Sequence, residues 1–259
     1  MPFLGTQPAE TALTTGDLGA DIVTGAKIAD DQIDSEHYVA ASIDNEHLAD
    51  DAVGVAELSA TGTASSSTFL RGDNAWAAPA GGSRKVLAVS TASGSSSAIN
   101  FTAFNNSAYD SYEFIVHYWK PSGDGIECWV RTSTDGGSSY DSGGSDYGFH
   151  NRRVNSSGVG GNHADSSENE IVILENGSSG GAAAGEALHF RLFLFSAGDS
   201  TYQKGITWEG ITSDASSVHM PFWGAALRFA TTDIDALQFL GASGTWSAKI
   251  TMIGINNSV

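Results

Sequence analysis

The sequence predicts a mostly β protein in which an elongated, intertwined N-terminal shaft, expected to be trimeric, precedes an antiparallel β-sandwich head of jelly-roll type. Many segments of residues 84–259 alternate apolar and polar side chains, which is typical of half-buried strands. Their connections are rich in Gly, Ser and Asn, and no long helical pattern occurs. Residues 13–58 instead place a large apolar residue at every fifth position. We therefore expect two parts that bury their apolar residues in different ways.

Ten strands are expected in residues 84–259. Alternation is clearest in SYEFIVHYW (111–119), EALHFRLFLFS (186–196) and GTWSAKITMIGI (244–255). Many short strands with turn-rich connections indicate an antiparallel sandwich. The expected strands cover residues 84–90, 97–102, 111–119, 125–133, 169–175, 186–196, 204–212, 217–229, 234–240 and 244–255.

Residues 13–60 carry a repeat whose shortest period is five and whose strongest similarity has a period of ten. The hexapeptide IDSEHY (33–38) recurs as IDNEHL (43–48). A period of five would spread apolar residues around a helix and place them on alternate faces of a strand. Three chains wound around one axis could instead each send one apolar residue inward per unit. The residues expected in this trimeric core are Leu18, Val23, Ile28, Ile33, Tyr38, Ile43, Leu48, Val53 and Leu58.

Two other interpretations of this repeat stay open. Its acidic, small-residue composition is also that of a disordered linker, although the regular placement of Ile, Leu and Val argues against disorder. His37 and His47 each follow a Glu, and three copies on an axis could form a metal-binding ring. Such residues are more often solvated or hydrogen-bonded, so no metal or other cofactor is assigned.

Charge and cysteine content exclude several classes of protein. The 259 residues include 30 acidic and 12 basic side chains, and the net charge of −18 would repel a nucleic-acid partner. The single cysteine, Cys128, excludes an intramolecular disulfide and a multi-cysteine zinc site, and its alternating context indicates a buried apolar role. No run of about 18 apolar residues predicts a membrane span, and the N-terminus lacks the pattern of a signal peptide.

Residues 61–83 are expected to join the shaft to the head. Their ends are small, polar and rich in Gly and Pro, whereas Phe69, Leu70 and Trp76 surround a Gly-Asp-Asn turn. These three side chains are expected to pack at the axis as a compact plug. The Arg71-Gly72-Asp73 tripeptide at this turn is interpreted as part of the junction and not as a cell-adhesion ligand.

No arrangement of residues predicts an enzyme. STDGGSSY (133–140) matches one copy of the Asp-box turn, which supports a hairpin but not a glycosidase propeller. Asp165, Glu168 and Glu170 could supply paired carboxylates for glycoside cleavage, although a solvated loop is the favoured interpretation. No nucleophile elbow, phosphate-binding loop or zinc-protease motif occurs in a suitable setting.

The segment of residues 140–168 is the least regular part of the head and is expected to form a long loop. Long loops on a rigid sandwich often carry binding residues. Aromatic rings could stack on sugars, and arginines could form paired hydrogen bonds. The competing interpretation is a loop whose aromatic residues fix it to the core. The candidate receptor-binding residues are Tyr140, Tyr147, Phe149, His150, Arg152 and Arg153.

These features together resemble bacteriophage tail fibres, the receptor-binding fibres of phage particles. The opening MPFLGTQPAETALTTGD looks like a virion-attachment end, and the repeat is similar to fibre shafts. The most specific match is GTASSSTFLRGDNAWAA, which is similar to the Gly-Thr-x-Ser-Ser-Thr-Phe-Leu-Arg-Gly-Asp-Gly-x-Trp segment between shaft and head. Asn74-Ala75 stands where that segment often has Gly-x. The resemblance covers residues 1–80 and extends more weakly into the head.

The resemblance implies a structural protein of the virion that is made in the host cytoplasm and attaches the particle to its host. It implies a homotrimer without membrane insertion, in which the head contacts a surface glycan or protein and the N-terminus docks to a tail or baseplate protein. The alternatives are a tailspike-type polysaccharide depolymerase and, less favoured, a bacterial surface adhesin. The implied parts are an attachment segment (1–12), the shaft (13–60), the junction (61–83) and the head (84–259).

Overall fold

The computed structural model describes residues 14–17, 19–30, 32–43, 45–50, 52–79, 83–155, 158, 160–174, 181–213 and 219–256. It separates into two compact units, Met1–Pro79 and Ala80–Val259. The first contains the predicted shaft and residues 61–79 of the predicted junction, and the second contains the predicted head. The attachment segment expected at residues 1–12 and the shaft residue Leu18 lie outside the described residues. Across the described ranges, no helix is long and apolar enough to cross a bilayer.

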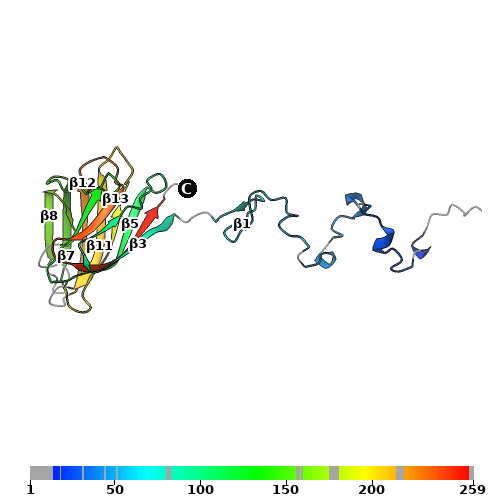
Figure 1. Ribbon diagram of the computed structural model, residues 1–259, viewed down its shortest axis with the longest axis horizontal. Helices are drawn as coiled ribbons and strands as arrows, with labels where there is room; N and C mark the ends of the chain where they lie inside the picture. The colour runs from blue at the N-terminus through cyan, green and yellow to red at the C-terminus, as the bar shows by residue number, and fades with distance from the viewer. Residues whose placement is uncertain are drawn as a thin grey trace, which may run out of the picture. The chain divides into compact units, whose positions relative to one another are not determined.

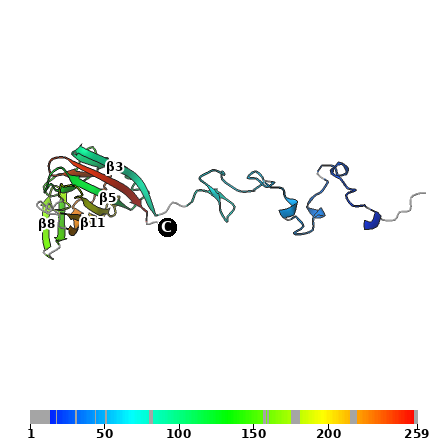
Figure 2. The same ribbon diagram turned by 90° about the horizontal axis from the view of Figure 1, so that it is seen from below.

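The head consists of two antiparallel sheets packed face to face, which confirms the mostly β prediction (Figures 1 and 2). Its strands are β3 (Arg84–Ser96), β4 (Ala98–Phe101), β5 (Ser111–Pro121), β6 (Cys128–Ser133), β7 (Tyr147–Val154), β8 (Gly160–Glu168), β9 (Ile171–Val172), β10 (Leu188–Leu194), β11 (Lys204–Ser213), β12 (His219–Arg228), β13 (Ala236–Gly241) and β14 (Trp246–Ile255). One sheet has the order β3-β14-β5-β10-β11-β12-β7-β8, and the other has the order β4-β13-β6-β9. Each of the ten predicted strands overlaps one of these strands. The jelly-roll likeness stays a prediction.

Alternating side chains from both sheets form one core. Phe114 on β5 lies edge-on to Phe101 on β4, with ring centroids 5.3 Å apart, and to Phe239 on β13, at 5.7 Å. Trp119 and Trp246 pack against each other at 5.9 Å and are almost fully buried. Because aromatic side chains bury large apolar areas, these contacts within and between the sheets contribute much of the hydrophobic stabilisation.

A buried polar network joins the two sheets at Asp141. The Oδ2 atom of Asp141 accepts hydrogen bonds from Nε of Arg228 at 2.7 Å and from Oγ1 of Thr132 at 2.8 Å. Tyr147 accepts from the Thr132 amide at 2.9 Å. Burial raises the pKa of Tyr147 to about 12, so its hydroxyl stays protonated at neutral pH. Asp141 and Arg228 therefore have the partners that burial of a charge requires.

The prediction of a long loop at residues 140–168 is wrong for the larger part of the segment. Residues 147–168 contain the strands β7 and β8. These two strands pair with each other and extend the eight-stranded sheet at one edge. Along β7, Tyr147, Phe149 and Asn151 alternate toward the core. The sequence of β8, GGNHADSSE, has low strand propensity, so pairing with β7 determines its conformation. Its polar character suits a strand at the edge of a sheet.

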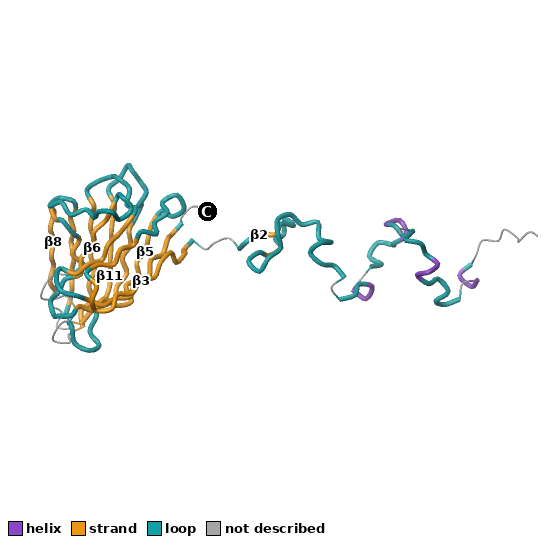
Figure 3. Tube along the Cα trace, viewed as in Figure 1, coloured by secondary structure: helices purple, strands orange, loops and turns teal. Residues whose placement is uncertain are grey.

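The first unit repeats one local structure every ten residues (Figure 3). Its 3-10 turns are η1 (Thr15–Asp17), η2 (Gly25–Lys27), η3 (Ser35–His37) and η4 (Asn45–His47). At η3, the Asp34 carboxylate accepts from the Glu36 amide at 3.2 Å and lies 2.7 Å from Nδ1 of His37. This capping box explains why Asp and His recur three residues apart. The structural unit is therefore ten residues long and contains two apolar positions.

The apolar residues of the repeat lie exposed in the single chain. Leu58 is half-buried at the end of the series. Among the described residues of the repeat, these side chains form no core within one copy of the chain, and their packing around a trimer axis stays a prediction. The turns recur regularly within one chain, and an ordered shaft stays a prediction. Exposed fractions lie between 36% and 56% for Val23, Ile28, Ile33, Tyr38, Ile43, Leu48 and Val53.

The junction contains a short hairpin of β1 (Phe69–Leu70) and β2 (Trp76–Ala77). Asn74 adopts a φ of 58°, which Asn and Gly tolerate better than other residues, so Asn can stand where the segment that this stretch resembles often has Gly. The side chains of Arg71 and Asp73 pair with each other at 3.2 Å on the exposed turn. Phe69 and Leu70 are exposed and Trp76 is half-buried, so their packing at an axis stays a prediction.

Candidate binding surface

The six candidate receptor-binding residues do not share one surface. Tyr147 and Phe149 are 0% and 4% exposed and face the core, so their rings are not presented to a ligand. This corrects the loop interpretation in favour of its competitor, in which aromatic residues hold the segment to the core. His150 and Arg152 are exposed on β7, and Arg153 is half-buried. Tyr140, which is also half-buried, belongs to a separate turn.

That turn is the Asp-box segment after β6, and its contacts are structural. The Asp135 carboxylate accepts from the Ser139 amide at 2.9 Å, from the Ser139 hydroxyl at 2.6 Å and from the Ser133 hydroxyl at 2.8 Å. These hydrogen bonds, first those from Ser139, lower the pKa of Asp135 to about 2. A Cβ at Gly137, where φ is 84°, would lie 2.9 Å from the Tyr140 hydroxyl. Tyr140 therefore packs against the turn.

The carboxylates considered for glycoside cleavage have other roles. Glu170 is 7% exposed and pairs with Arg131 at 3.1 Å. Burial and the nearby charge of Asp165 raise the pKa of Glu168. A glycosidase pair spans a cleft from two elements, whereas Asp165 and Glu168 lie three positions apart on the edge strand β8. In the part of the chain that the structure describes, no three potential metal ligands cluster.

A broad surface covers the face of the eight-stranded sheet that points away from the four-stranded sheet, and we call it the outer face. Strand register builds this face in rows that cross all eight strands. One row consists of Val89, Thr251, Ile115, Arg191, Glu209, Trp223, Arg152 and Asn162. The next row consists of Val86, Ile253, Glu113, Phe193, Thr207, Ala225, His150 and Ala164.

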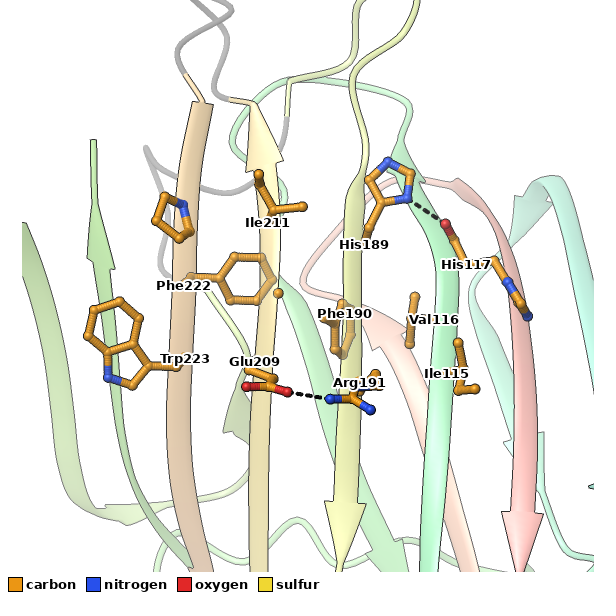
Figure 4. A pocket seen from close by; sticks show the side chains of 12 residues that line it. Ile115, Val116, His117, His189, Phe190, Arg191, Glu209, Ile211, Phe222 and Trp223 are labelled. Carbon is orange, nitrogen blue, oxygen red and sulfur yellow. Dashed lines mark hydrogen bonds and ion pairs between the residues drawn. The ribbon is translucent and has the colours of Figure 1, made fainter. Parts of the chain in front are cut away.

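A groove of about 650 Å³ lies on the outer face over β5, β10, β11 and β12 (Figure 4). Ile211 and Trp223 contribute exposed apolar side chains to it, and Pro221, which pairs with Ile211, also lines it. A second hollow of about 520 Å³ lies nearby over β7, β11 and β12, where Leu227 and Phe229 are exposed. Both depressions are lined mainly by apolar side chains and backbone, which favours contact with another apolar surface.

The polar groups of the groove mostly pair with one another. Arg191 donates to the Glu209 carboxylate at 2.6 Å, and Figure 4 shows this pair across neighbouring strands. Nδ1 of His189 contacts the backbone oxygen of His117, whose own Nε2 lies 2.9 Å from the Thr251 hydroxyl. These pairings use part of the hydrogen-bonding capacity of the groove within the sheet itself.

Glu113 is a buried carboxylate on the outer face. Its side chain is 0% exposed, although it lies on the uncovered side of the sheet. Arg84 and Arg191 approach it from either side, and Nη1 of Arg191 lies 3.7 Å from Oε1. Both arginine side chains are about half exposed. A carboxylate without water needs such cationic partners, so these three residues form one charge cluster.

The sequence interpretation missed the outer face, although a signal for it was present. In β5, Ile115 lies between the core residues Phe114 and Val116, and in LFLF (192–195) both faces carry large apolar residues. When one face of a strand packs on the core of a sandwich and the other face meets water, apolar and polar residues alternate along the strand. Apolar residues on both faces of a strand are therefore the sequence signal of an outer face that is not mainly polar.

In comparisons with protein-family models, curated proteins and solved structures, none matched this chain.

Proposed function

We propose that this chain is a structural fibre of a phage-type tail, which attaches the virion to the host cell surface. In this proposal three copies form the shaft, the N-terminus docks to a tail or baseplate protein, and the jelly-roll-like head contacts a surface glycan or protein. The carrying observation is the ten-residue repeat, which forms one turn per unit and leaves apolar residues exposed at five-residue steps. Further copies of the chain are the partners whose apolar residues repeat with the same spacing.

The junction and the head support the same assignment. The hairpin around Arg71 and Asp73 joins a repetitive unit to a unit with its own core. An attachment fibre needs such a division, because the shaft supplies reach and the head supplies a rigid surface for recognition.

Adsorption to cells tests the proposal directly. The purified full-length protein is incubated with a panel of bacterial strains, and bound protein is measured after the cells are sedimented. We expect saturable binding to a restricted set of strains and competition with virion adsorption on those strains. Variants that lack residues 84–259 should not bind. Absence of saturable binding on strains that adsorb the virion would contradict the proposal.

The same cells distinguish the enzymatic alternative. Reducing sugar ends and oligosaccharides are measured after incubation of the protein with purified capsule or lipopolysaccharide from a strain that it binds. We expect binding without cleavage. Release of oligosaccharides would establish a depolymerase and would replace the proposed role.

A further inference from the structure

We propose that the outer face of the eight-stranded sheet is the surface through which the heads of the three chains pack against one another. This inference rests on the proposed trimer and adds to it a second interface, in a unit that has a complete core of its own. In this proposal, another copy of this chain occupies the groove shown in Figure 4.

The distribution of exposed apolar residues is the first support. Among the described residues of the head, all but one of the exposed large apolar side chains lie on the outer face, and the exception is Tyr202. Single exposed apolar residues are common in proteins, but a concentration of them on one sheet face indicates an interaction site. The residues concerned are Val86, Val89, Phe195, Ile211, Trp223, Leu227 and Phe229, each between 37% and 57% exposed.

The open face of the four-stranded sheet provides an internal comparison. It carries the polar side chains Asn100, Arg131 and Gln238 beside the half-buried Trp129 and Leu240, and Gln238 donates to Asn100 at 2.9 Å. Among the described residues, this face carries no exposed large apolar side chain, which suits a sheet face that meets water. The open face of the four-stranded sheet is thus suited to water, whereas the outer face of the eight-stranded sheet is suited to contact with another apolar surface.

Charge is the second support. The chain has a net charge of −18, so most surfaces of two copies would repel each other. The outer face is different, because Arg84, Arg152, Arg191 and Lys249 outnumber Glu113 and Glu209. Here copies could meet without a concentration of like acidic charge, and the half-exposed arginine side chains beside Glu113 could donate to a neighbouring chain.

Chain connectivity is the third support. Arg84 begins β3, and only four residues separate it from Pro79 at the end of the first unit. Five residue steps span at most about 18 Å, so three shafts on one axis would bring three copies of Arg84 near that axis. Arg84 lies at the margin of the outer face, next to the row that contains Val86. The margin of this face would therefore lie within reach of the axis in each of the three chains.

Thiol accessibility in the full-length protein tests the interface. Cys128, the single native cysteine, is fully buried, and burial raises the pKa of its thiol, so the background reaction is low. Ile211→Cys and Trp223→Cys place thiols on the outer face, and Asn100→Cys places one on the four-stranded sheet. We expect Ile211→Cys and Trp223→Cys to react with a maleimide on the order of tenfold more slowly than Asn100→Cys, because they are reached only when heads separate.

A second substitution shows whether slow labelling of an introduced thiol comes from burial in the interface between heads or from its surroundings within one head. Leu227→Lys adds a charge to an exposed outer-face position, and Gln238→Lys is its matched control on the other sheet. Combined with Ile211→Cys, Leu227→Lys should restore rapid labelling while the circular dichroism spectrum stays unchanged, whereas Gln238→Lys should leave labelling slow.

Light scattering on the same samples distinguishes the possible failures. A trimer whose Ile211→Cys and Trp223→Cys variants label as fast as the Asn100→Cys control would overturn the outer-face interface and leave the proposed shaft intact. The groove would then be free for another ligand, such as a glycan. A monomeric full-length protein would overturn both the interface and the proposed trimeric shaft.

Discussion

Individual charged residues of the head lie beside groups that offset the cost of burying their charge. Asp141 and Arg228 show this most clearly. Side-chain exposure is 6% for Arg228 and 23% for Asp141, and their contact of 2.7 Å links the segment after β6 to β12. Arg228 also donates to the Thr232 hydroxyl at 2.9 Å. The pair therefore fixes how two parts of the sandwich meet.

Arg228→Ala should lower the free energy of unfolding by about 3 kcal/mol, because it leaves the Asp141 carboxylate partly buried without its cation. Urea denaturation followed by tryptophan fluorescence measures this loss. Lys85→Ala removes an exposed cation from the same head and should change stability by less than about 0.5 kcal/mol. Equal effects of the two substitutions would mean that the Asp141 pair contributes no more than a surface charge.

The lowered pKa of Asp135 predicts a specific dependence of the stability of the head on pH. Its pKa falls from the ordinary value of 3.8 to about 2 in the folded protein, first through hydrogen bonds from Ser139. The folded form thus binds a proton less readily than the unfolded chain. The stabilisation is therefore fully present above about pH 4 and is lost as pH falls through the folded pKa.

Asp135→Asn should accordingly reduce the loss of unfolding free energy between about pH 4 and about pH 2, as measured by urea denaturation at both values. Ser139→Ala removes the largest cause of the shift and should have the same effect in weaker form. An unchanged difference between the two pH values in both variants would show that the turn does not contribute to acid sensitivity.

At the scale of elements, neighbouring strands impose constraints that no single strand reveals. Gly224 in β12 pairs with Trp208 in β11, and a Cβ at position 224 would lie 2.2 Å from the indole ring and 2.8 Å from the backbone oxygen of His150. Trp208 cannot move away freely, because its Nε1 donates to the Ile173 oxygen at 2.9 Å. The glycine therefore makes room for the tryptophan.

Gly224→Ala should destabilise the head by roughly 1–3 kcal/mol through this overpacking, despite the usual gain from replacing glycine in a strand. The midpoint of thermal unfolding provides the measurement. Gly123→Ala is the matched control, because its nearest neighbour would be 3.8 Å away, and it should be close to neutral. A stable Gly224→Ala variant would imply that β11 and β12 shift apart at little cost.

The sequence was sufficient to predict ten strands of the head because their alternation of apolar residues is strong. It failed for β7 and β8 because Gly, Ser and Asp dominate the second strand, although the alternation of Tyr147 and Phe149 was visible in the first. The candidate receptor residues fell largely on this hairpin, so their burial could not be inferred before its pairing was known. The outer face depends on register across eight strands, which single-strand patterns do not contain.

At the scale of the whole molecule, the two units bury apolar residues in different ways. The head encloses Phe114, Trp119 and their neighbours within one chain. The repeat leaves Ile33 and Ile43 at 42% and 47% exposure, and its turns are held by local hydrogen bonds such as that of Asp34. Stability of the repeat should therefore depend on association, and so on protein concentration, whereas that of the head core should depend on it much less.

Ile33→Asp combined with Ile43→Asp in the full-length chain tests this difference. Three copies of each introduced carboxylate would meet at the proposed axis, where charge is costly to bury, so the assembly should shift from trimer toward monomer in sedimentation experiments. The fluorescence of the head, which reports its buried tryptophans, should stay native. Val39→Asp is the matched control, because Val39 lies outside the five-residue series and is 79% exposed, and this variant should remain trimeric. If the doubly substituted chain keeps the trimer mass, or if Val39→Asp dissociates it equally, the five-residue series does not form the shaft core.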